Sequence, residues 1–486
     1  MQQKVKLAMI ALCYSPLTFA QNTEQKVASN LDENAFTFTE AQLGEDDNVS
    51  QNVTILNSNS NVFASEAGYL FSPMRYRYRA FNQKHNDVYI NGAPVNDLET
   101  GQFRFSNIGG LNRFSRNVDF ALPFEGANYG MTGMAGSNNY DFRAGSMQVG
   151  QYASIAAANR NYTLRGMYTY SSGFNNRGWA FSAGVTYRWA NRGYVEGTFY
   201  NALSYYLGVQ KKWNNGHSLS LTTWGNPTER SNQGAATDET YWLTNNRYYN
   251  PYWGYQNGKK RNSRIVNDFA PSALLTWDWD INDKMKLTTS AFGKYSMYKS
   301  TKLEYNNAEN PQPDYYKNMP SAFYYVWNTD HSNIIQSNNE TAFQQWQDVY
   351  NAWTTTKANQ QINWDRLYWS NKNAAANGSD ALYFIQAKHI DGLTLNLSST
   401  LTAKVTKNST LYGGFTIGSN SNRHYQTMED LLGASTYHNV NSHLTGSYAS
   451  TAPEIQYDLN HPNALVGEGD KFGYDYKIEV LKGLLW

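Results

Sequence analysis

The strongest constraint on the fold of this 486-residue chain is a sustained alternation of large apolar residues with small or polar ones. It is clearest from residue 178 to residue 189. The large apolar positions there are Trp179, Phe181, Ala183, Val185, Tyr187 and Trp189. Successive side chains of a β-strand point to opposite faces, so a segment of this kind forms a sheet with one apolar and one polar face.

The same alternation recurs further along the chain. Its apolar members are Phe199, Leu203, Tyr205, Leu207 and Val209, then Leu287, Ala291, Tyr295 and Met297, then Leu393, Leu395, Leu397 and Leu401, and finally Leu411, Phe415 and Ile417. Most segments have about 11 to 15 residues, whereas a tilted strand needs about 9 to 11 to cross a bilayer. The pattern indicates either a membrane β-barrel or a soluble β-sandwich, whose strands also alternate.

Two observations favour the barrel. Tyrosine and tryptophan gather near segment ends, as in Tyr187 and Trp189, where a barrel places its interfacial aromatic residues. The connections also alternate between short and long. The long loops are predicted at residues 229–267, 300–391 and 421–469. Tight turns on one rim and long loops on the other are typical of outer-membrane barrels, so we predict a partial barrel over residues 147–486.

Composition excludes several other classes. Aromatic residues make up 15% of the chain and charged residues only 16%, which argues against disorder. After the N-terminal segment there is no apolar run long enough for a spanning helix, which needs about 20 residues. The formal net charge of +1, from 40 basic and 39 acidic residues, gives no electrostatic reason to expect nucleic acid as a partner.

Residues 1–20 have the features of a secretory signal peptide. Two lysines precede a short apolar stretch, and the segment ends with Thr18-Phe19-Ala20. The alternative is a buried first helix. Cys13 is the only cysteine, so cleavage after Ala20 leaves a chain without disulfides or zinc-thiolate sites. We therefore expect export to the envelope of a Gram-negative bacterium.

The number of strands is small for loops of this length. An unpaired strand edge cannot stand in hydrocarbon, where every backbone group must be satisfied internally. The sequence is therefore expected to be a truncated barrel. The alternative is a complete barrel that ends at the aromatic residue Trp486.

Several segments near the N-terminus resemble the plug domain of TonB-dependent outer-membrane receptors. The first alternates arginine with aromatic residues, the second is a turn after an apolar strand, and the third is a glycine-spaced stretch. The residues in question are Arg75, Arg77 and Arg79, then Asn91, Gly92 and Pro94, then Gly130, Gly133 and Gly136. The likeness covers residues 49–146 and, more loosely, the later strands, and it looks closest to the receptors of Bacteroidetes.

The chain departs from the family pattern at two places. Ala80 follows Arg79 where the family has glycine, and Asn91 stands where the family usually has aspartate. The turn is expected to survive, because asparagine also tolerates a positive φ.

The resemblance implies a mainly β fold, in which an N-terminal α+β plug domain lies inside an antiparallel transmembrane β-barrel. In the family, basic plug residues meet acidic residues of the barrel wall; the alternative for the three arginines is a solvent-exposed basic strip. The implied function is ligand-gated import of a scarce solute, driven by TonB. The alternative is a passive surface protein, an adhesin or an assembly component, with a filled barrel.

Residues 21–48 are expected to be a periplasmic segment that carries the TonB-coupling motif. Strand addition by TonB requires a short exposed segment with strand propensity. The best match is Ala35, Phe36, Thr37, Phe38, Thr39 and Glu40.

The ligand is not identified by the sequence. Aromatic loop residues, represented by Tyr241, Trp242, Tyr252 and Trp253, offer flat faces that could stack on sugar rings, or they could form the core of the loops themselves. A small solute or oligosaccharide, outer-membrane lipid and a surface lipoprotein are the expected partners. The scattered histidines and the weak glycine pattern at residues 467–473 indicate no catalytic residue, metal site or cofactor, so we do not expect an enzyme.

Overall fold

The computed structural model describes residues 81–159, 162–323, 340–441, 443–444, 447–449 and 451–486. The expected signal peptide at 1–20, the candidate coupling motif at 35–40 and the arginines Arg75, Arg77 and Arg79 lie outside these residues.

Residues 83–146 form a small N-terminal domain around a four-stranded sheet with the order β2-β1-β4-β3. Its elements are η2 (Gln83–His85), β1 (Asp87–Ile90), β2 (Ala93–Pro94), α4 (Ser106–Gly109), η3 (Asn112–Ser115), β3 (Val118–Ala121), β4 (Ser137–Tyr140) and η4 (Ala144–Ser146). Strand β1 pairs with β4 in parallel and with β2 as an antiparallel hairpin. As predicted, Asn91 and Gly92 make the hairpin turn, with φ values of 49° and 80°.

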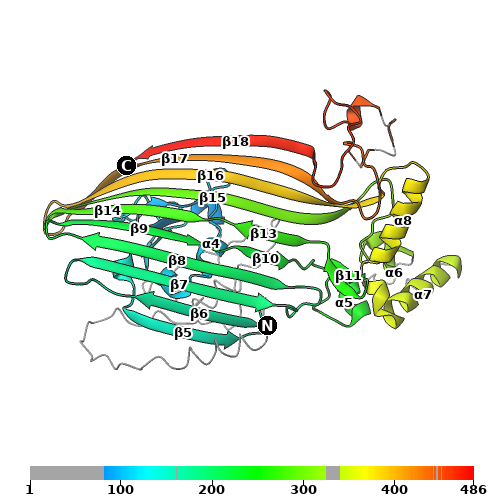
Figure 1. The fold of residues 1–486 in the computed structure, drawn as a ribbon, viewed down its shortest axis with the longest axis horizontal. Helices are drawn as coiled ribbons and strands as arrows, with labels where there is room; N and C mark the ends of the chain where they lie inside the picture. The colour runs from blue at the N-terminus through cyan, green and yellow to red at the C-terminus, as the bar shows by residue number, and fades with distance from the viewer. Residues whose placement is uncertain (1–80, 160–161, 324–339, 442, 445–446, 450) are drawn as a thin grey trace.

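The remainder is dominated by a 12-stranded sheet in which all neighbours are antiparallel. Its strands are β5 (Gly150–Ala157), β6 (Leu164–Ser171), β7 (Trp179–Ala190), β8 (Tyr200–Lys212), β9 (His217–Gly225), β10 (Thr228–Ser231), β13 (Ile265–Phe269), β14 (Ser272–Asn282), β15 (Met285–Tyr305), β16 (Tyr383–Lys404), β17 (Thr410–Asp430) and β18 (Lys471–Leu485). Figure 1 shows the N-terminal domain behind this sheet, which we call the wall. Among the described residues, β5 and β18 are its two edges.

The two ends of the wall differ. Tight turns join the strands at one end, while the helices and the small β11–β12 hairpin gather at the other (Figure 1). These elements are α5 (Asp238–Thr244), β11 (Trp253–Gln256), β12 (Lys259–Asn262), η5 (Tyr316–Asn318), α6 (Pro320–Phe323), α7 (Glu340–Thr355), η7 (Lys357–Gln360), α8 (Trp364–Ala376) and η8 (Pro453–Ile455). In the part of the chain that the structure describes, no helix has the length and apolar character needed to cross a membrane.

Three strands of the wall extend further into the long loops than the sequence predicted. Strand β15 pairs with β16 without interruption from Met285 with Ala403 to Tyr305 with Tyr383. The loop expected at 300–391 is therefore confined to 306–382, and the one expected at 421–469 begins after Asp430. Charged side chains, among them Lys299, His389 and Asp391, enter the outward positions of these extensions, so the apolar alternation that marks the strands is interrupted there.

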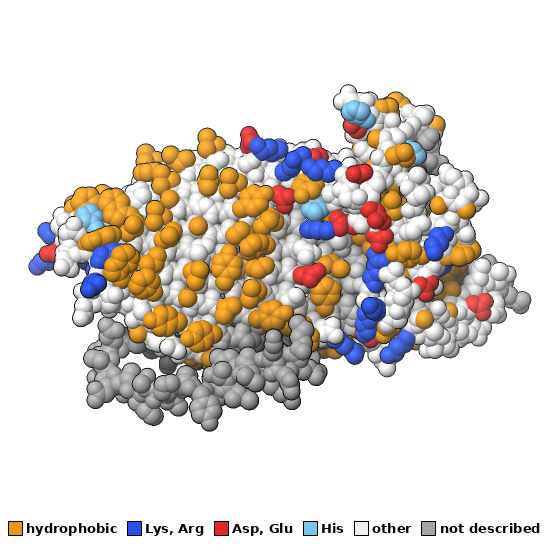
Figure 2. Space-filling model, in the orientation of Figure 1, with side chains coloured by type: hydrophobic (Ala, Val, Ile, Leu, Met, Phe, Trp, Pro, Cys, Tyr) orange, Lys and Arg blue, Asp and Glu red, His pale blue; other side chains and the backbone are white. Residues whose placement is uncertain are grey.

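The wall has one apolar and one polar face, as the alternation predicted. Outward side chains are large and exposed, for example Leu207 at 53%, Leu221 at 50% and Leu395 at 51%. Figure 2 shows these outward side chains as a broad hydrophobic band across the strands. Most inward side chains are small or polar and buried, and a few large ones, such as Tyr206, Trp224 and Phe292, are buried among them. The small or polar ones include Ser182, Thr186, Ser204, Ser220, Thr222, Thr276, Ser290, Thr394, Asn396 and Ser398.

A core between the N-terminal domain and the wall is built around Phe142, which is fully buried. Its ring packs edge-on against Tyr206 and Trp224 of the wall, with ring centroids 6.0 and 5.0 Å apart. Tyr206 also stacks on Phe114 of the N-terminal domain at 4.0 Å. The two parts of the chain therefore share one hydrophobic cluster.

We expect Phe142→Ala to lower the free energy of unfolding by about 3–5 kcal/mol, because it leaves a cavity in this shared cluster. Urea unfolding of the detergent-solubilised protein, followed by tryptophan fluorescence, measures the change. The matched control is Phe124→Ala, whose side chain is 82% exposed in the same domain, and which should cost no more than about 0.5 kcal/mol. Equal losses in the two variants would contradict the shared core.

Candidate functional site at the contact of the N-terminal domain with the wall

The inward face of the wall hydrogen-bonds the backbone of the β1–β2 hairpin. The Ser290 hydroxyl donates to the carbonyl oxygen of Asn91 at 2.7 Å, and the Ser398 hydroxyl donates to that of Gly92 at 2.9 Å. The Asn396 amide donates to the carbonyl oxygen of Pro94 at 2.7 Å. The turn residues that the sequence singled out thus lie directly against strands β15 and β16.

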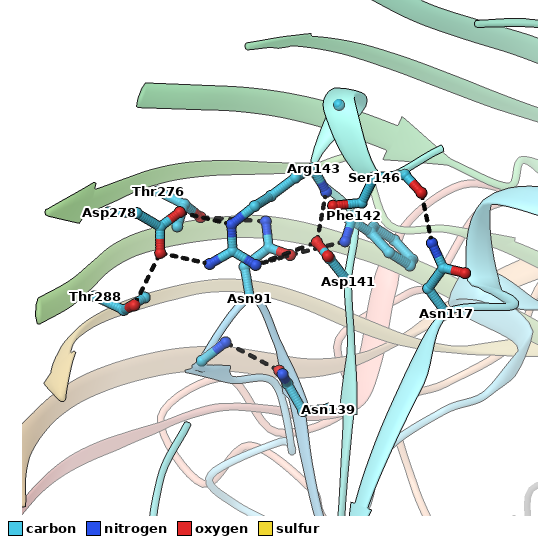
Figure 3. Close-up of polar contacts among 12 residues, drawn as sticks. Asn91, Asn117, Asn139, Asp141, Phe142, Arg143, Ser146, Thr276, Asp278 and Thr288 are labelled. Carbon is cyan, nitrogen blue, oxygen red and sulfur yellow. Dashed lines mark hydrogen bonds and ion pairs between the residues drawn. The ribbon is translucent and has the colours of Figure 1, made fainter. Parts of the chain in front are cut away.

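A buried ion pair joins the end of the N-terminal domain to strand β14 (Figure 3). Arg143 donates from Nε and Nη2 to the two carboxylate oxygens of Asp278, at 2.7 and 3.0 Å, and from Nη1 to Asp141 at 3.1 Å. The Thr288 hydroxyl donates to Asp278 as well, at 2.8 Å. Burial alone would lower the pKa of Arg143, but the two carboxylates raise it above its ordinary value, so the guanidinium stays charged.

The carbonyl oxygen of Phe142, next to this arginine, accepts two hydrogen bonds from the wall. The Tyr206 hydroxyl donates at 2.7 Å and the Thr222 hydroxyl at 3.0 Å. Asn91 ties the same segment to the hairpin, because its side-chain oxygen accepts from the Phe142 N–H at 2.7 Å while its amide donates to Thr276 at 3.2 Å. Asn91 therefore serves both as the turn residue and as a bridge between the domain and the wall.

A third contact involves a titratable pair. Glu99, in the loop that follows β2, accepts a hydrogen bond from the Asn422 amide of β17 at 2.7 Å. The Nε2 atom of His424 lies 3.0 Å from the same carboxylate oxygen, and the histidine ring stacks on Tyr476. This contact becomes an ion pair when the histidine is protonated.

The glycine-spaced stretch passes close to strand β1. A Cβ added at Gly130 would lie 2.6 Å from the ring of Tyr89, and one added at Gly133 would lie 2.4 Å from a carboxylate oxygen of Asp87. Gly136 has a φ of 81°, which favours glycine. The glycine spacing thus allows the stretch to pack against β1. Burial at this contact raises the pKa of the Asp87 carboxyl to about 6.

Tyr252 and Trp253, two of the four loop aromatics that the sequence offered as ligand platforms, lie within the packing of the loops. Trp253 is buried, with the Lys260 ammonium 4.7 Å from its ring centre. The Arg264 guanidinium lies 4.7 Å from the ring centre of Tyr252. Both rings therefore have cationic neighbours from the same chain.

The other two loop aromatics, Tyr241 and Trp242, both lie on α5. The Tyr241 hydroxyl accepts from the N–H of Ala236 at 3.2 Å, and its ring packs against a small loop core. Trp242 is 52% exposed, and its ring is tilted against Tyr350 of α7 at 5.6 Å. Of the four, Trp242 presents the most surface to solvent in this structure.

The sequence did not identify the charged residues that join the domain to the wall, namely Arg143, Asp278, Glu99 and His424. The inward position of Asp278 could have been recognised from the sequence. Asp278 stands between Trp277 and Trp279, and because these tryptophans point outward, its carboxylate points inward. No comparable pattern marked its partner. Within the described residues, no three His, Cys, Asp or Glu side chains lie close enough together to hold a metal ion.

No protein-family model matches this sequence, and no curated protein matches it either. Similar solved structures do exist. The siderophore receptor PiuA from Acinetobacter baumannii is 12% identical, with 72% of this chain and 39% of that chain covered and a TM-score of 0.39. The ferric-catecholate import receptor Fiu from E. coli K12, in its open form, is 14% identical, with 84% and 50% covered and a TM-score of 0.42.

The ferripyoverdine receptor of the outer membrane of Pseudomonas aeruginosa is 10% identical, with 84% of this chain and 44% of that chain covered and a TM-score of 0.43. The chain thus spans half or less of the length of these three structures.

We expect Arg143→Ala to lower the free energy of unfolding by about 3–5 kcal/mol, because it leaves the buried Asp278 carboxylate without its partner. The matched control is Arg423→Ala. Arg423 also makes a two-bond pair, with Asp475, but its side chain is 53% exposed, so its loss should change the free energy of unfolding far less. Urea unfolding and amide hydrogen exchange over residues 87–94 report the difference. If the two variants behave alike, the Arg143 pair does not hold the domain.

The stability of the N-terminal domain should fall as pH rises from about 4 to about 6, because ionisation of Asp87 costs more in the folded than in the unfolded state. The folded pKa of about 6 lies above the ordinary value of 3.8, so the unfolded chain loses this proton first. Asp87→Asn cannot ionise. The variant should match the wild type at pH 4 and exceed it above pH 6 in urea unfolding midpoint; a difference that is constant with pH would refute this.

Proposed function

We propose that this chain is part of a TonB-dependent outer-membrane receptor that imports a scarce solute by ligand-gated rearrangement of its plug. In this proposal the N-terminal domain is the plug and the 12-stranded sheet is part of the barrel wall. The observation that carries the proposal is the sidedness of the wall, which is apolar outward, polar inward, and hydrogen-bonded inward to a separately folded domain.

The outward face supports a position in the outer membrane. Its exposed side chains form one broad apolar band across the strands (Figure 2). Soluble monomers seldom expose continuous apolar surface of this kind, since their largest apolar patches cover about 300–600 Å². Aromatic residues such as Tyr187 and Trp189 are outward and about half exposed, as in the aromatic girdles of membrane barrels. Export by cleavage of residues 1–20 would bring the chain to that membrane.

The inward contacts support a plug that can move. Ser290, Ser398 and Asn396 hold the hairpin by single hydrogen bonds, each of which contributes about 0.5–1.5 kcal/mol to stability. Replacing such bonds by hydrogen bonds to water costs much less free energy than unfolding the plug. The Arg143–Asp278 pair and the cluster around Phe142 lie at the end of the plug next to the wall, where they would act as the fixed part during rearrangement.

Coupling to TonB would use the segment at residues 35–40, which TonB would extend as an added β-strand. The solute is a small molecule or an oligosaccharide that the long loops capture, and Trp242, at 52% exposed, is the most exposed of the four candidate loop aromatics. A surface lipoprotein that covers the loops is a further partner in this proposal.

The proposal predicts that deletion of residues 35–40 abolishes energy-dependent uptake of candidate solutes while the amount of protein at the cell surface stays unchanged. The control deletes residues 22–27, a segment of the same length in the same region, and should leave uptake intact. Growth on candidate oligosaccharides and metal chelates, with surface labelling of the protein, provides the measurement. Unchanged uptake after the first deletion would reject TonB coupling and favour a passive surface protein.

A further inference from the structure

The end of the wall that carries the tight turns is rich in basic side chains. The turns between neighbouring strands there are residues 172–178, 213–216, 283–284 and 405–409. Figure 2 shows Lys and Arg side chains at this end, just beyond the hydrophobic band. We name the following set, which lies in these turns or directly beside them, the basic rim: Arg177, Lys211, Lys212, Lys284, Lys404 and Lys407.

Few carboxylates accompany the basic rim. Asp280 and Asp283 lie in the same stretch of the chain as Lys284. Another lysine at this end, Lys286, pairs with Asp278 on the inward face at 3.8 Å. Among the residues that the structure describes, none of the six side chains of the basic rim takes part in an ion pair. The rim therefore has an excess of positive charge.

Two of these lysines are direct neighbours. The N–H of Lys404, at the end of β16, donates to the carbonyl oxygen of Lys284 at 2.8 Å. Both side chains are exposed, and so is that of Lys407 in the next turn. Like charges on neighbouring strands repel each other, so an anion bound beside them would relieve this repulsion.

The opposite end of the wall is different, because many of its charges are paired within the chain. Lys299 pairs with Glu429, Arg423 with Asp475, and Arg261 with Asp430. These cations already have carboxylate partners.

A belt of tryptophans separates the basic rim from the apolar band. Trp179 and Trp213 are 38% and 42% exposed, and the Lys211 ammonium lies 5.2 and 5.9 Å from their ring centres. Further along the wall, Trp277 and Trp279 stack on each other at 5.8 Å. Tryptophan is enriched where hydrocarbon meets water in membrane proteins. In a bilayer, the basic rim would therefore begin at the depth of the lipid headgroups.

We propose that the basic rim binds anionic phospholipid headgroups of the leaflet on its side of the membrane; this rests on the proposed membrane position of the wall. In outer-membrane barrels the tight turns lie on the periplasmic side, so this leaflet is the periplasmic one. The neighbouring Lys284 and Lys404, with Lys407, are the centre of the site.

Net charge selects the headgroup. A headgroup with a phosphate and no ammonium, such as that of phosphatidylglycerol, brings a net negative charge to the rim. A zwitterionic headgroup brings an ammonium as well, which the unpaired lysines repel. Clusters of four to eight basic residues next to a membrane are typical of binding to anionic lipids.

Electron paramagnetic resonance of the protein in liposomes tests this, with spin-labelled phosphatidylglycerol and spin-labelled phosphatidylcholine of identical acyl chains as probes. We expect the first lipid to be preferred about fivefold at the protein surface, which corresponds to the contribution of one basic residue, about 1 kcal/mol. In about 1 M sodium chloride, where the Debye length is about 3 Å, most of the preference should disappear.

The variant Lys284→Gln/Lys404→Gln/Lys407→Gln removes three exposed charges from the rim and should lower the preference to less than about twofold. The matched control removes the same number of exposed charges from the helices at the opposite end and should keep the wild-type preference. It is Lys317→Gln/Lys357→Gln/Lys372→Gln.

Equal association of the two lipids, or an equal loss of preference in the two triple variants, would overturn the lipid assignment. Flotation of the protein with liposomes separates this result from failure of the proposed function. If the protein floats but shows no preference, the wall is in the bilayer, and an acidic periplasmic protein becomes the favoured partner of the rim. If it does not float, the membrane position is rejected, and the lipid assignment with it.

Discussion

The structure depends on which groups hydrogen-bond the polar side chains on the inward face of the wall. Successive side chains of a strand point to opposite faces, and in this wall the residues that alternate with the outward leucines and tryptophans are mostly serine, threonine and asparagine. The N-terminal domain supplies acceptors for these groups, and its hairpin carbonyls meet Ser290, Ser398 and Asn396. The domain and the wall therefore need each other, since buried polar groups without partners are costly.

The two kinds of contact between the domain and the wall have different roles. A buried ion pair such as Arg143 with Asp278 adds little net stability compared with an apolar pair of the same shape, because both charges lose their hydration. Its bidentate geometry fixes position instead. The single hydrogen bonds to the hairpin can exchange with water, whereas the aromatic cluster around Phe142 cannot do so without loss of packing. The hairpin takes part in both kinds of contact, because Val88, Ile90 and Ala93 belong to the same cluster as Phe142.

Prolines interrupt two neighbouring strands of the wall, Pro227 between β9 and β10 and Pro271 between β13 and β14. The carbonyl oxygen of Pro227 accepts from the N–H of Leu203 in β8, and that of Pro271 accepts from the N–H of Tyr295 in β15. The return bond of each pair is missing, because proline has no N–H. The strands are therefore interrupted at these positions but stay attached to their outer neighbours.

The sequence by itself determined the sidedness of the strands and the Asn91–Gly92 turn, because both depend on residues that are near neighbours along the chain. It did not determine the full length of β15, β16 and β17, since their ends carry polar residues such as Lys299 and His389 outward and lose the apolar signal. Only the tertiary structure decided which charges meet. Arg143 and Asp278 are 135 residues apart in sequence, and their contact follows from the curvature and register of the whole wall around the domain.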